Sequence, residues 1–151
     1  KIIDQYATGG EKLRAAIRGL GEKDLKSFPV PGTWSIQQIV IHMMDSELVS
    51  VDRMKRMIAE ENPTLIGYDE TKYSKNLFYD DQPADDAVTI FDLNRKLFTR
   101  ILRLLPDYTF DRIGTHNERG KVTLGGYLKG VVDHLEHHLK FIHDKRKKLG
   151  K

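Results

Sequence analysis

The chain has 151 residues, of which 39% are hydrophobic and 31% charged, and its formal net charge is +3. This length suits one hydrophobic core, so we expect residues 1–151 to form a single domain. No apolar run approaches the roughly 18 residues of a membrane span, and the first residues lack the apolar segment of a signal peptide. The absence of cysteine excludes disulfides, cysteine-ligated zinc and a protein thiol nucleophile. We therefore expect a cytoplasmic protein with no membrane partner.

Apolar residues spaced three and four positions apart predict the first two helices. The first helix is expected over roughly residues 4–20, with a glycine pair that weakens its start. The second is expected over residues 35–61, where Ser35 and the glutamine three positions later form a capping-box pattern. We expect Pro63 to end this second helix, because proline cannot continue the helical hydrogen bonds.

The rest of the chain predicts a long connection and two more helices. Residues 63–83 are too polar and broken for a main helix, although they have room for a short one. The third helix is expected over residues 85–105, before Pro106, and the fourth over residues 123–149, with Thr123 as its cap. Strand alternation is nearly absent, and no heptad seam marks a face for a partner. These features predict an all-α fold, a four-helix bundle with a long crossover between helices 2 and 3.

Three histidines lie within residues 131–140 ("VVDHLEHHLK") of the fourth helix. With about 100° of rotation per residue, His138 falls inside the apolar stripe of this helix and His134 falls at its margin. His137 lies about 60° outside His134, and His143 lies on the opposite face. Two of the four histidines in this helix are therefore expected to face the interior.

The second helix supplies a third histidine of this kind, because His42 lies about 60° from the centre of its apolar stripe. Three such imidazoles are either core residues with satisfied ring nitrogens or ligands of one metal ion. His134 and His138 have the i, i+4 spacing that lets two imidazoles bind one cation, and a facing helix can supply the third ligand. Three neutral nitrogens with an open fourth position describe a catalytic zinc-type site. The order "HLEHH" differs from the H-E-x-x-H of metalloproteases, so we expect Glu136 to be a solvated carboxylate.

Three segments, in the same order along the chain, resemble the DinB superfamily and especially its YfiT-like branch. They are "WSIQQIVIHMMDSE" (34–47), "PTLIGYDE" (63–70) and "GKVTLGGYLKGVVDHLEHHLKFI" (120–142). Each motif alone is weak, but the ordered set is fairly specific and spans residues 29–142.

This resemblance implies a four-helix bundle that commonly forms a homodimer and holds a divalent ion, zinc or nickel, on three histidines. Matched by position, the implied metal ligands are His42, His134 and His138, the residues that helical geometry turns inward. Members of the family are described as metal-dependent hydrolases. Related ones transfer low-molecular-weight thiols such as bacillithiol, mycothiol or glutathione to electrophiles, or isomerise maleylpyruvate with a thiol cofactor.

The chain departs from the family pattern at two positions, which leaves the substrate undetermined. Phe141 stands in place of a common glutamine, and Tyr73 stands where many relatives have tryptophan. Both changes are expected to remodel a pocket near the metal.

Four further features near the predicted site have open roles. Asp45 follows His42 by one turn and is either a carboxylate that orients a histidine ring from behind or a solvated residue. Residues 68–70 of the crossover are implied, by the resemblance alone, to cover the site. His116 is expected to be a surface loop histidine, the alternative being a histidine that approaches the open end of the bundle. Trp34 is expected to pack at the end of the bundle.

The first hypothesis for function is a metal-dependent enzyme that transfers a low-molecular-weight thiol to a small electrophilic substrate. A cation on three histidines would bind a thiol as its thiolate, or lower the pKa of bound water from about 15.7 toward 7. The alternatives are a metal-dependent hydrolase and a non-catalytic metal-binding or interaction bundle. The modest charge, and a basic C-terminal end without interleaved aromatic residues, argue against a nucleic-acid partner.

Overall fold

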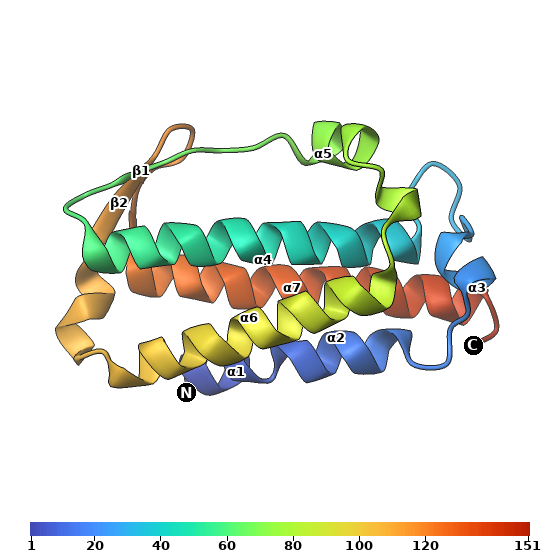
Figure 1. Ribbon diagram of the computed structural model, residues 1–151, viewed down its shortest axis with the longest axis horizontal. Helices are drawn as coiled ribbons and strands as arrows, with labels where there is room; N and C mark the ends of the chain where they lie inside the picture. Colours follow the sequence, from blue (N-terminus) through green and yellow to red (C-terminus); the bar gives the residue numbers. More distant parts are fainter.

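The computed structural model describes residues 1–151 and places four long helical units side by side (Figure 1). The first unit is α1 (Ile2–Ala7) followed by α2 (Gly9–Ile17), and the others are α4 (Ile36–Ala59), α6 (Ala84–Leu104) and α7 (Leu124–Lys148). The shorter elements are α3 (Glu22–Lys26), α5 (Glu70–Asn76), the 3-10 turns η1 (Tyr79–Asp81) and η2 (Asp107–Asp111), and the strands β1 (Thr64–Leu65), β2 (Ile113–His116) and β3 (Gly120–Thr123). The predicted four-helix bundle with a long crossover between helices 2 and 3 is confirmed.

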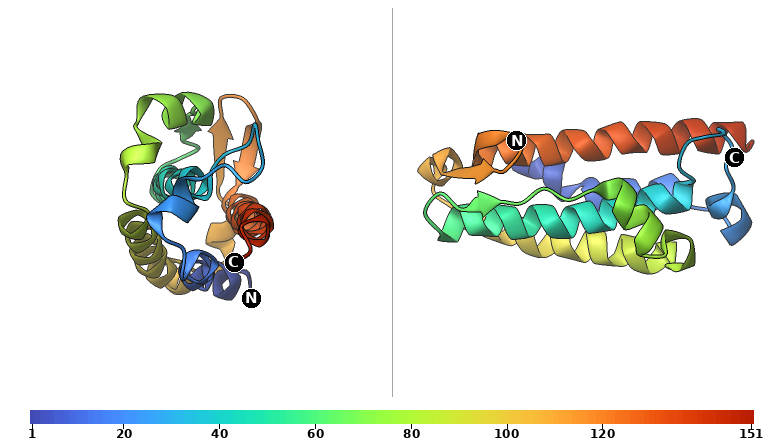
Figure 2. Two further views of the ribbon diagram at one scale, coloured as in Figure 1. Left: turned by 90° about the vertical axis from the view of Figure 1, so that its right-hand side faces the viewer. Right: turned by 90° about the horizontal axis from the view of Figure 1, so that it is seen from above.

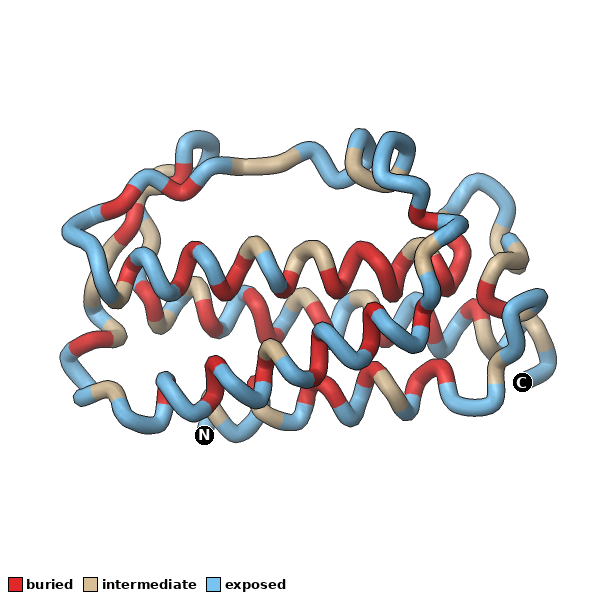
Figure 3. Tube along the Cα trace, in the orientation of Figure 1, coloured by how far each residue is buried: buried red, intermediate tan, exposed pale blue.

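Buried residues lie along the inward faces of the four units (Figure 3). They form two apolar clusters, and the larger one contains Ile36, Ile39 and Met43 of α4 together with Leu135 and Leu139 of α7. The histidine-bearing turns of α4 and α7 therefore belong to a packed part of the bundle. None of the helices combines the length and the apolar composition that a membrane crossing requires.

The two helices that carry the candidate ligands begin at the predicted caps. The Ser35 hydroxyl accepts a hydrogen bond from the backbone N–H of Gln38, and the Gln38 side chain accepts one from the backbone N–H of Ser35, both at 3.1 Å. The Thr123 hydroxyl accepts from the backbone N–H of Gly126 at 3.0 Å. The end of α4 is earlier than predicted, at Ala59 rather than next to Pro63.

The first predicted helix is divided at Thr8, and the two glycines that follow it are buried. A Cβ atom on Gly9 would lie 2.1 Å from Nη1 of Arg95, and one on Gly10 would lie 2.0 Å from Oδ1 of Asp92. Both distances are far below van der Waals contact. The glycine pair therefore lets α2 approach α6 closely, which is a reason for its presence beyond weak helix propensity.

A buried polar network joins α1, α4 and α6. Nε of Arg95 donates to Oε1 of Glu47 at 3.0 Å, and its Nη1 donates to the backbone carbonyl of Tyr6 at 3.0 Å. The Tyr6 hydroxyl donates to the other carboxylate oxygen of Glu47 at 2.5 Å. Burial and the Glu47 charge raise the pKa of Tyr6 well above its usual value, so the phenol stays a donor.

A small sheet of order β1-β2-β3, which the sequence did not predict, lies beside the bundle. β2 pairs antiparallel with β3 and parallel with β1, so that Thr115 lies opposite both Lys121 and Thr64. Strands of two to four residues carry too little alternation to be predicted from sequence. The sheet ties the start of the crossover to the hairpin before α7, and both rise over α4 and α7 (Figure 2, left).

One side of α6 exposes a continuous row of large apolar residues. Ile90, Leu93, Leu97, Ile101 and Leu104 are all exposed and follow each other at intervals of three or four residues. They fall within about 80° of the helical wheel, on the side of α6 that faces away from its buried residues. The expectation that no heptad seam marks a face for a partner remains a prediction, and the bundle shows that this side of α6 is left uncovered.

Candidate metal centre

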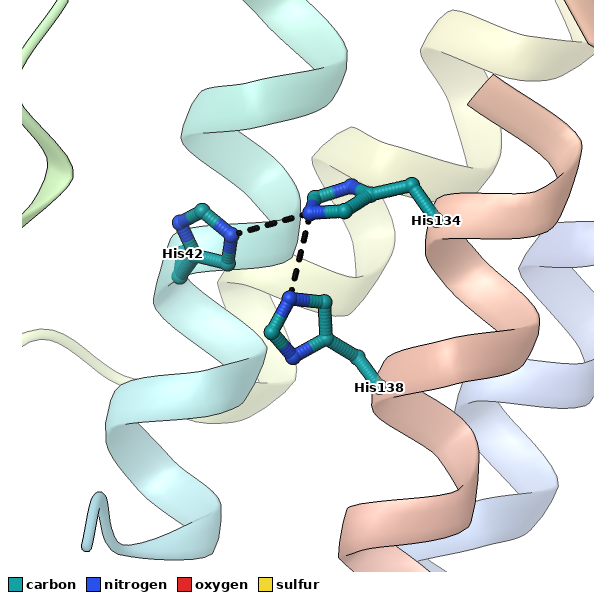
Figure 4. A group of neighbouring side chains, drawn as sticks. All are labelled: His42, His134 and His138. Atoms are coloured by element: carbon teal, nitrogen blue, oxygen red, sulfur yellow. Dashed lines mark hydrogen bonds between the residues drawn. The ribbon is translucent and has the colours of Figure 1, made fainter. Parts of the chain in front are cut away.

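The side chains of His42, His134 and His138 converge on one point between α4 and α7 (Figure 4). Nε2 of His134 lies 3.3 Å from Nε2 of His42 and 3.1 Å from Nε2 of His138. One candidate ligand atom from each residue lies within 4.8 Å of the others. The two rings of α7 lie one turn apart and nearly perpendicular to each other, with an interplanar angle of 86°. The ring of α4 faces them from the second turn after the Ser35 cap.

This arrangement fits a divalent cation. Nitrogen ligands about 2.05 Å from a tetrahedral zinc ion are about 3.3 Å apart, close to the two distances between the histidine nitrogens. The fit also accounts for the direction of the rings, since three Nε2 lone pairs that point at one another repel unless a proton or a cation lies between them. The Nδ1 atoms of His42 and His138 are buried without a hydrogen-bond partner, so neither ring is oriented by a hydrogen bond at its second nitrogen.

Burial keeps all three imidazoles neutral at pH 7. Burial, and next the neighbouring His138 and His134, lowers the pKa of His42 to about 3. Burial likewise lowers the pKa of His134 to about 4, with smaller effects from His137, Arg119 and Arg95. Burial and the two adjacent histidines lower the pKa of His138 to about 4. Neutral imidazoles are the form that binds metal ions.

The other residues of the histidine-rich stretch lie outside the cluster, as the helical wheel predicts. His137 and His143 are exposed on α7. Glu136 is also exposed and forms a surface ion pair with Lys12, so it does not face the three histidines.

One carboxylate of the crossover lies next to the cluster. Oε2 of Glu70, at the start of α5, lies 3.6 Å from Nε2 of His42. The crossover thus brings a carboxylate to the site, as the resemblance implied for residues 68–70. Asp45 accepts a hydrogen bond from the Tyr79 hydroxyl at 2.6 Å, while Asp69 accepts from the backbone N–H of Lys72 and caps α5. The contact of Asp45 is with a phenol, and its role in orienting a histidine ring remains a prediction.

Two pockets meet at the histidines. The first, of about 500 Å³, runs between α4 and α7 and is lined by His42 and His134. The second, of about 1150 Å³, lies nearer the end of α7 and is lined by His134 and His138. His134, Glu70 and Arg119 line both pockets. The cluster is therefore reachable from two directions, unlike a closed structural metal site.

The aromatic residues singled out in the sequence surround these pockets. Trp34 packs edge-on against His42, with ring centroids 5.1 Å apart, and contributes to the apolar cluster as expected. Phe141 lines the second pocket and contacts the rings of His137 and His138. Tyr73 lies against Tyr68, which lines the first pocket, at a centroid distance of 4.6 Å.

His116 was predicted to be a surface loop histidine, and this was wrong. It lies in β2, is buried, and accepts hydrogen bonds at Nδ1 from the backbone N–H groups of Glu118 and Arg119. The ring folds back against the tight β2–β3 turn, where Nδ1 accepts from these two backbone amides. This contact within the hairpin accounts for the low exposure of the ring. His116 is not a member of the three-histidine cluster.

Arg53 is a pocket residue that the sequence reasoning missed. It lies eleven residues after His42, which places it about 20° from His42 on the helical wheel. Ser46 and Ser50 share this face, and all four residues line the first pocket. The shared face is readable from sequence, but a polar strip on a helix normally indicates exposure to solvent, and only the crossover above it makes this strip part of a pocket.

The fold and the cluster define a class of protein, a four-helix bundle with three convergent histidines open to two pockets. The family model of the DinB superfamily matches residues 5–142, and the chain belongs to this superfamily. YfiT from Bacillus subtilis has a similar solved structure, with a TM-score of 0.93 and 26% identity over 99% of this chain and 86% of that one. YfiT is described as a probable metal-dependent hydrolase with an unusual four-helix bundle topology.

Two similar sequences come from species of Bacillus. A protein of Bacillus mycoides (strain KBAB4) is 29% identical over 99% of this chain and 88% of its own length. A protein of Bacillus cereus (strain B4264) is 30% identical over 92% of this chain and 80% of its own length. Both carry the name "Putative metal-dependent hydrolase". Dependence on a metal ion is thus part of the names of these relatives.

Proposed function

We propose that the protein is a metal-dependent enzyme that transfers a low-molecular-weight thiol to a small electrophile. In this proposal His42, His134 and His138 hold a divalent ion, zinc or nickel, through their Nε2 atoms. The observation that carries it is the convergence of the three nitrogens at a point open to two pockets. A bound divalent ion supplies positive charge that lowers the pKa of a thiol or of water at the open position.

The residues around the cluster have distinct tasks in this proposal. Glu70, with its carboxylate 3.6 Å from Nε2 of His42, accepts the proton that the nucleophile releases. Trp34 and the apolar cluster beneath it hold the ring of His42 in place. Burial of the histidines keeps each ring in the neutral form that can act as a ligand.

One observation favours thiol transfer over hydrolysis. The reaction joins two substrates, and two pockets lead to the same histidines from different directions. The chain contains no cysteine, so a thiol at the site must come from a small molecule. A thiol substrate also fits the cytoplasmic location expected from the sequence, which stays a prediction.

Hydrolysis is the second candidate function, because the relatives are named for it. Glu70 would then accept a proton from water rather than from a thiol. A bundle that binds metal without turnover is the third candidate.

We also propose that the protein forms a homodimer through the apolar row on α6. Residues 90–104 present five exposed apolar side chains in one stripe, and exposed stripes of this kind mark protein interfaces. A second copy of the chain offers the same stripe, so the two surfaces can cover each other about a twofold axis.

The metal content of tag-free protein tests the site. We expect about one equivalent by mass spectrometry in the wild type and a large loss in His42→Ala, His134→Ala and His138→Ala. His143→Ala is the matched control, since it removes an exposed histidine of the same helix and is expected to keep the metal. Absence of metal after incubation with zinc and nickel would overturn the proposal.

Turnover then separates the three candidates. Thiol transfer predicts consumption of monochlorobimane that requires an added thiol and disappears with a chelator and in His138→Ala. Hydrolysis predicts metal-dependent cleavage of an ester without thiol. Bound metal with neither activity would identify a non-catalytic bundle.

A further inference from the structure

The first pocket contains a buried cation that the proposed chemistry does not use. Arg53 is only 8% exposed and is one of the residues that line the pocket. Nη1 donates to the Tyr127 hydroxyl at 3.0 Å, and Nη2 donates to the backbone carbonyl of Ile66. Both partners are uncharged, and Nε is buried without any partner.

No carboxylate of the chain forms an ion pair with Arg53. This distinguishes it from Arg95, whose buried charge is matched by Glu47. A buried charge with neutral partners is costly, and the cost is offset when an anion binds next to it. Each Nη group carries two N–H donors, so one N–H of each group remains after the two hydrogen bonds and can donate to an anion.

The pocket has its carboxylate, Glu70, at the histidine end, 3.6 Å from His42, and its buried cation, Arg53, farther along α4. Eleven residues of helix separate His42 from Arg53, a rise of about 16 Å between their Cα atoms. The walls between them carry hydroxyl groups, those of Ser46, Ser50 and Tyr127 among them.

Arg119, an exposed residue of the β2–β3 turn, adds a second positive charge to the lining. The opposite wall is open, because a Cβ atom on Gly130 of α7 would meet nothing within 4 Å. The pocket therefore has room for an elongated ligand, and its volume of about 500 Å³ is that of a small-molecule site.

We propose that Arg53 binds a carboxylate of the substrate, and that the substrate is an elongated polar molecule whose other end reaches the three histidines. The inference rests on the proposed metal site for one end of the ligand only. Arg53 acts as a specificity residue here, because it selects the anionic substrate and does not take part in the reaction at the histidines.

Paired thiols test this on cobalt-substituted protein, where the visible absorption of the metal reports thiolate binding. The long pair is 8-mercaptooctanoate and 8-mercapto-1-octanol, and the short pair is 3-mercaptopropionate and 3-mercapto-1-propanol. We expect the long carboxylate to bind at least about tenfold more tightly than the long alcohol, from hydrogen bonds to a charged group. The short pair is expected to bind equally, because its carboxylate does not reach Arg53.

Arg53→Gln is expected to bring the ratio for the long pair close to one while the metal content and the affinity for the long alcohol stay unchanged. Arg53→Lys should keep part of the preference. Lys148→Gln is the matched control, since it removes a cation from the second pocket and should leave the ratio as in the wild type. Equal binding of the long pair to the wild type, or a preference that survives Arg53→Gln, would overturn the proposal.

Gly130→Leu tests the pocket without touching Arg53. The added side chain enters open space, so we expect the protein to fold, to keep its metal and to bind both long thiols about tenfold more weakly. Unchanged binding of the long thiols to Gly130→Leu would show that they do not use this pocket and would also overturn the proposal.

A protein that binds no cobalt would contradict the proposed function but not by itself the carboxylate site. In that case calorimetry of octanoate and 1-octanol with metal-free protein tests the carboxylate site by itself. Octanoate binding that is lost in Arg53→Gln and kept in Lys148→Gln supports the site, and its absence from the wild type rejects it.

Discussion

His42 and His134 are 92 residues apart in the sequence, and their Nε2 atoms lie 3.3 Å apart between two helices. Two protonated imidazoles at this distance would repel each other strongly. The low pKa values of both rings, about 3 for His42 and about 4 for His134, follow from burial together with such neighbouring charges. The same packing that suits the rings to a metal ion makes protonation costly.

The metal-free protein should therefore lose stability in mild acid. Unfolded histidines have a pKa near 6.5, so between pH 6.5 and about 4 the unfolded chain binds protons that the folded chain does not. Each of the three histidines then lowers the free energy of unfolding by up to about 1.4 kcal/mol per pH unit as the pH falls. Above pH 6.5 these groups contribute no pH dependence. Urea unfolding of chelator-treated protein at pH 7 and pH 5 measures this, and His42→Gln should show a smaller loss. An equal loss in both proteins would contradict the prediction.

Glu70→Gln should separate metal binding from turnover. The substitution keeps the shape of the side chain but removes the proton acceptor, so we expect normal metal content and activity lower by about 10²–10⁴-fold. Asp69→Asn, at the neighbouring cap of α5, serves as the control and should affect activity far less. Full activity in Glu70→Gln would show that the proton leaves by another route.

Removal of one member of the buried network should destabilise the bundle without affecting the metal. Glu47→Ala leaves Arg95 buried without its carboxylate, which typically costs about 3–5 kcal/mol. Tyr6→Phe removes one hydrogen bond to Glu47 and should cost about 1–2 kcal/mol. Denaturant unfolding of the single and double variants measures both costs, and we expect them to be non-additive because the residues share partners.

Alanine should have opposite effects at two helical glycines. At Gly10 the added Cβ would lie 2.0 Å from Asp92, so Gly10→Ala must move α2 away from α6 and should destabilise the protein. At Gly130 the Cβ meets nothing within 4 Å, so Gly130→Ala should stabilise by up to about 1 kcal/mol through helix propensity. Thermal or urea unfolding compares the stability of the two variants. A gain in stability in Gly10→Ala would rule out the close approach of α2 to α6 as the reason for a glycine at this position.

A charge in the apolar row of α6 should dissociate the proposed homodimer. Leu97→Glu places a carboxylate in the middle of the row, where it would face its own copy across a twofold axis. Light scattering after size-exclusion chromatography should show a dimer in the wild type and a monomer in this variant. Leu48→Glu, at an exposed leucine of α4, is the control and should remain dimeric. A monomeric wild type would reject the interface.

The helices and the inward direction of the three histidines were predictable because they depend on local rules. Helical periodicity places His42, His134 and His138 on or beside apolar stripes, and the caps at Ser35 and Thr123 determine where the two helices begin. Each prediction needs only residues within a few turns of one another. The family resemblance then joined the two helices into one site.

The rest depends on contacts between distant parts of the chain. The burial of His116 follows from the β2–β3 hairpin, and the contact of Glu70 with His42 follows from the path of the crossover. Arg53 belongs to a pocket rather than to the surface because the crossover covers a polar strip of α4. A sequence pattern shows which face of a helix is polar, but whether that face meets water, a neighbouring segment or a ligand is decided only by the packing of the whole chain.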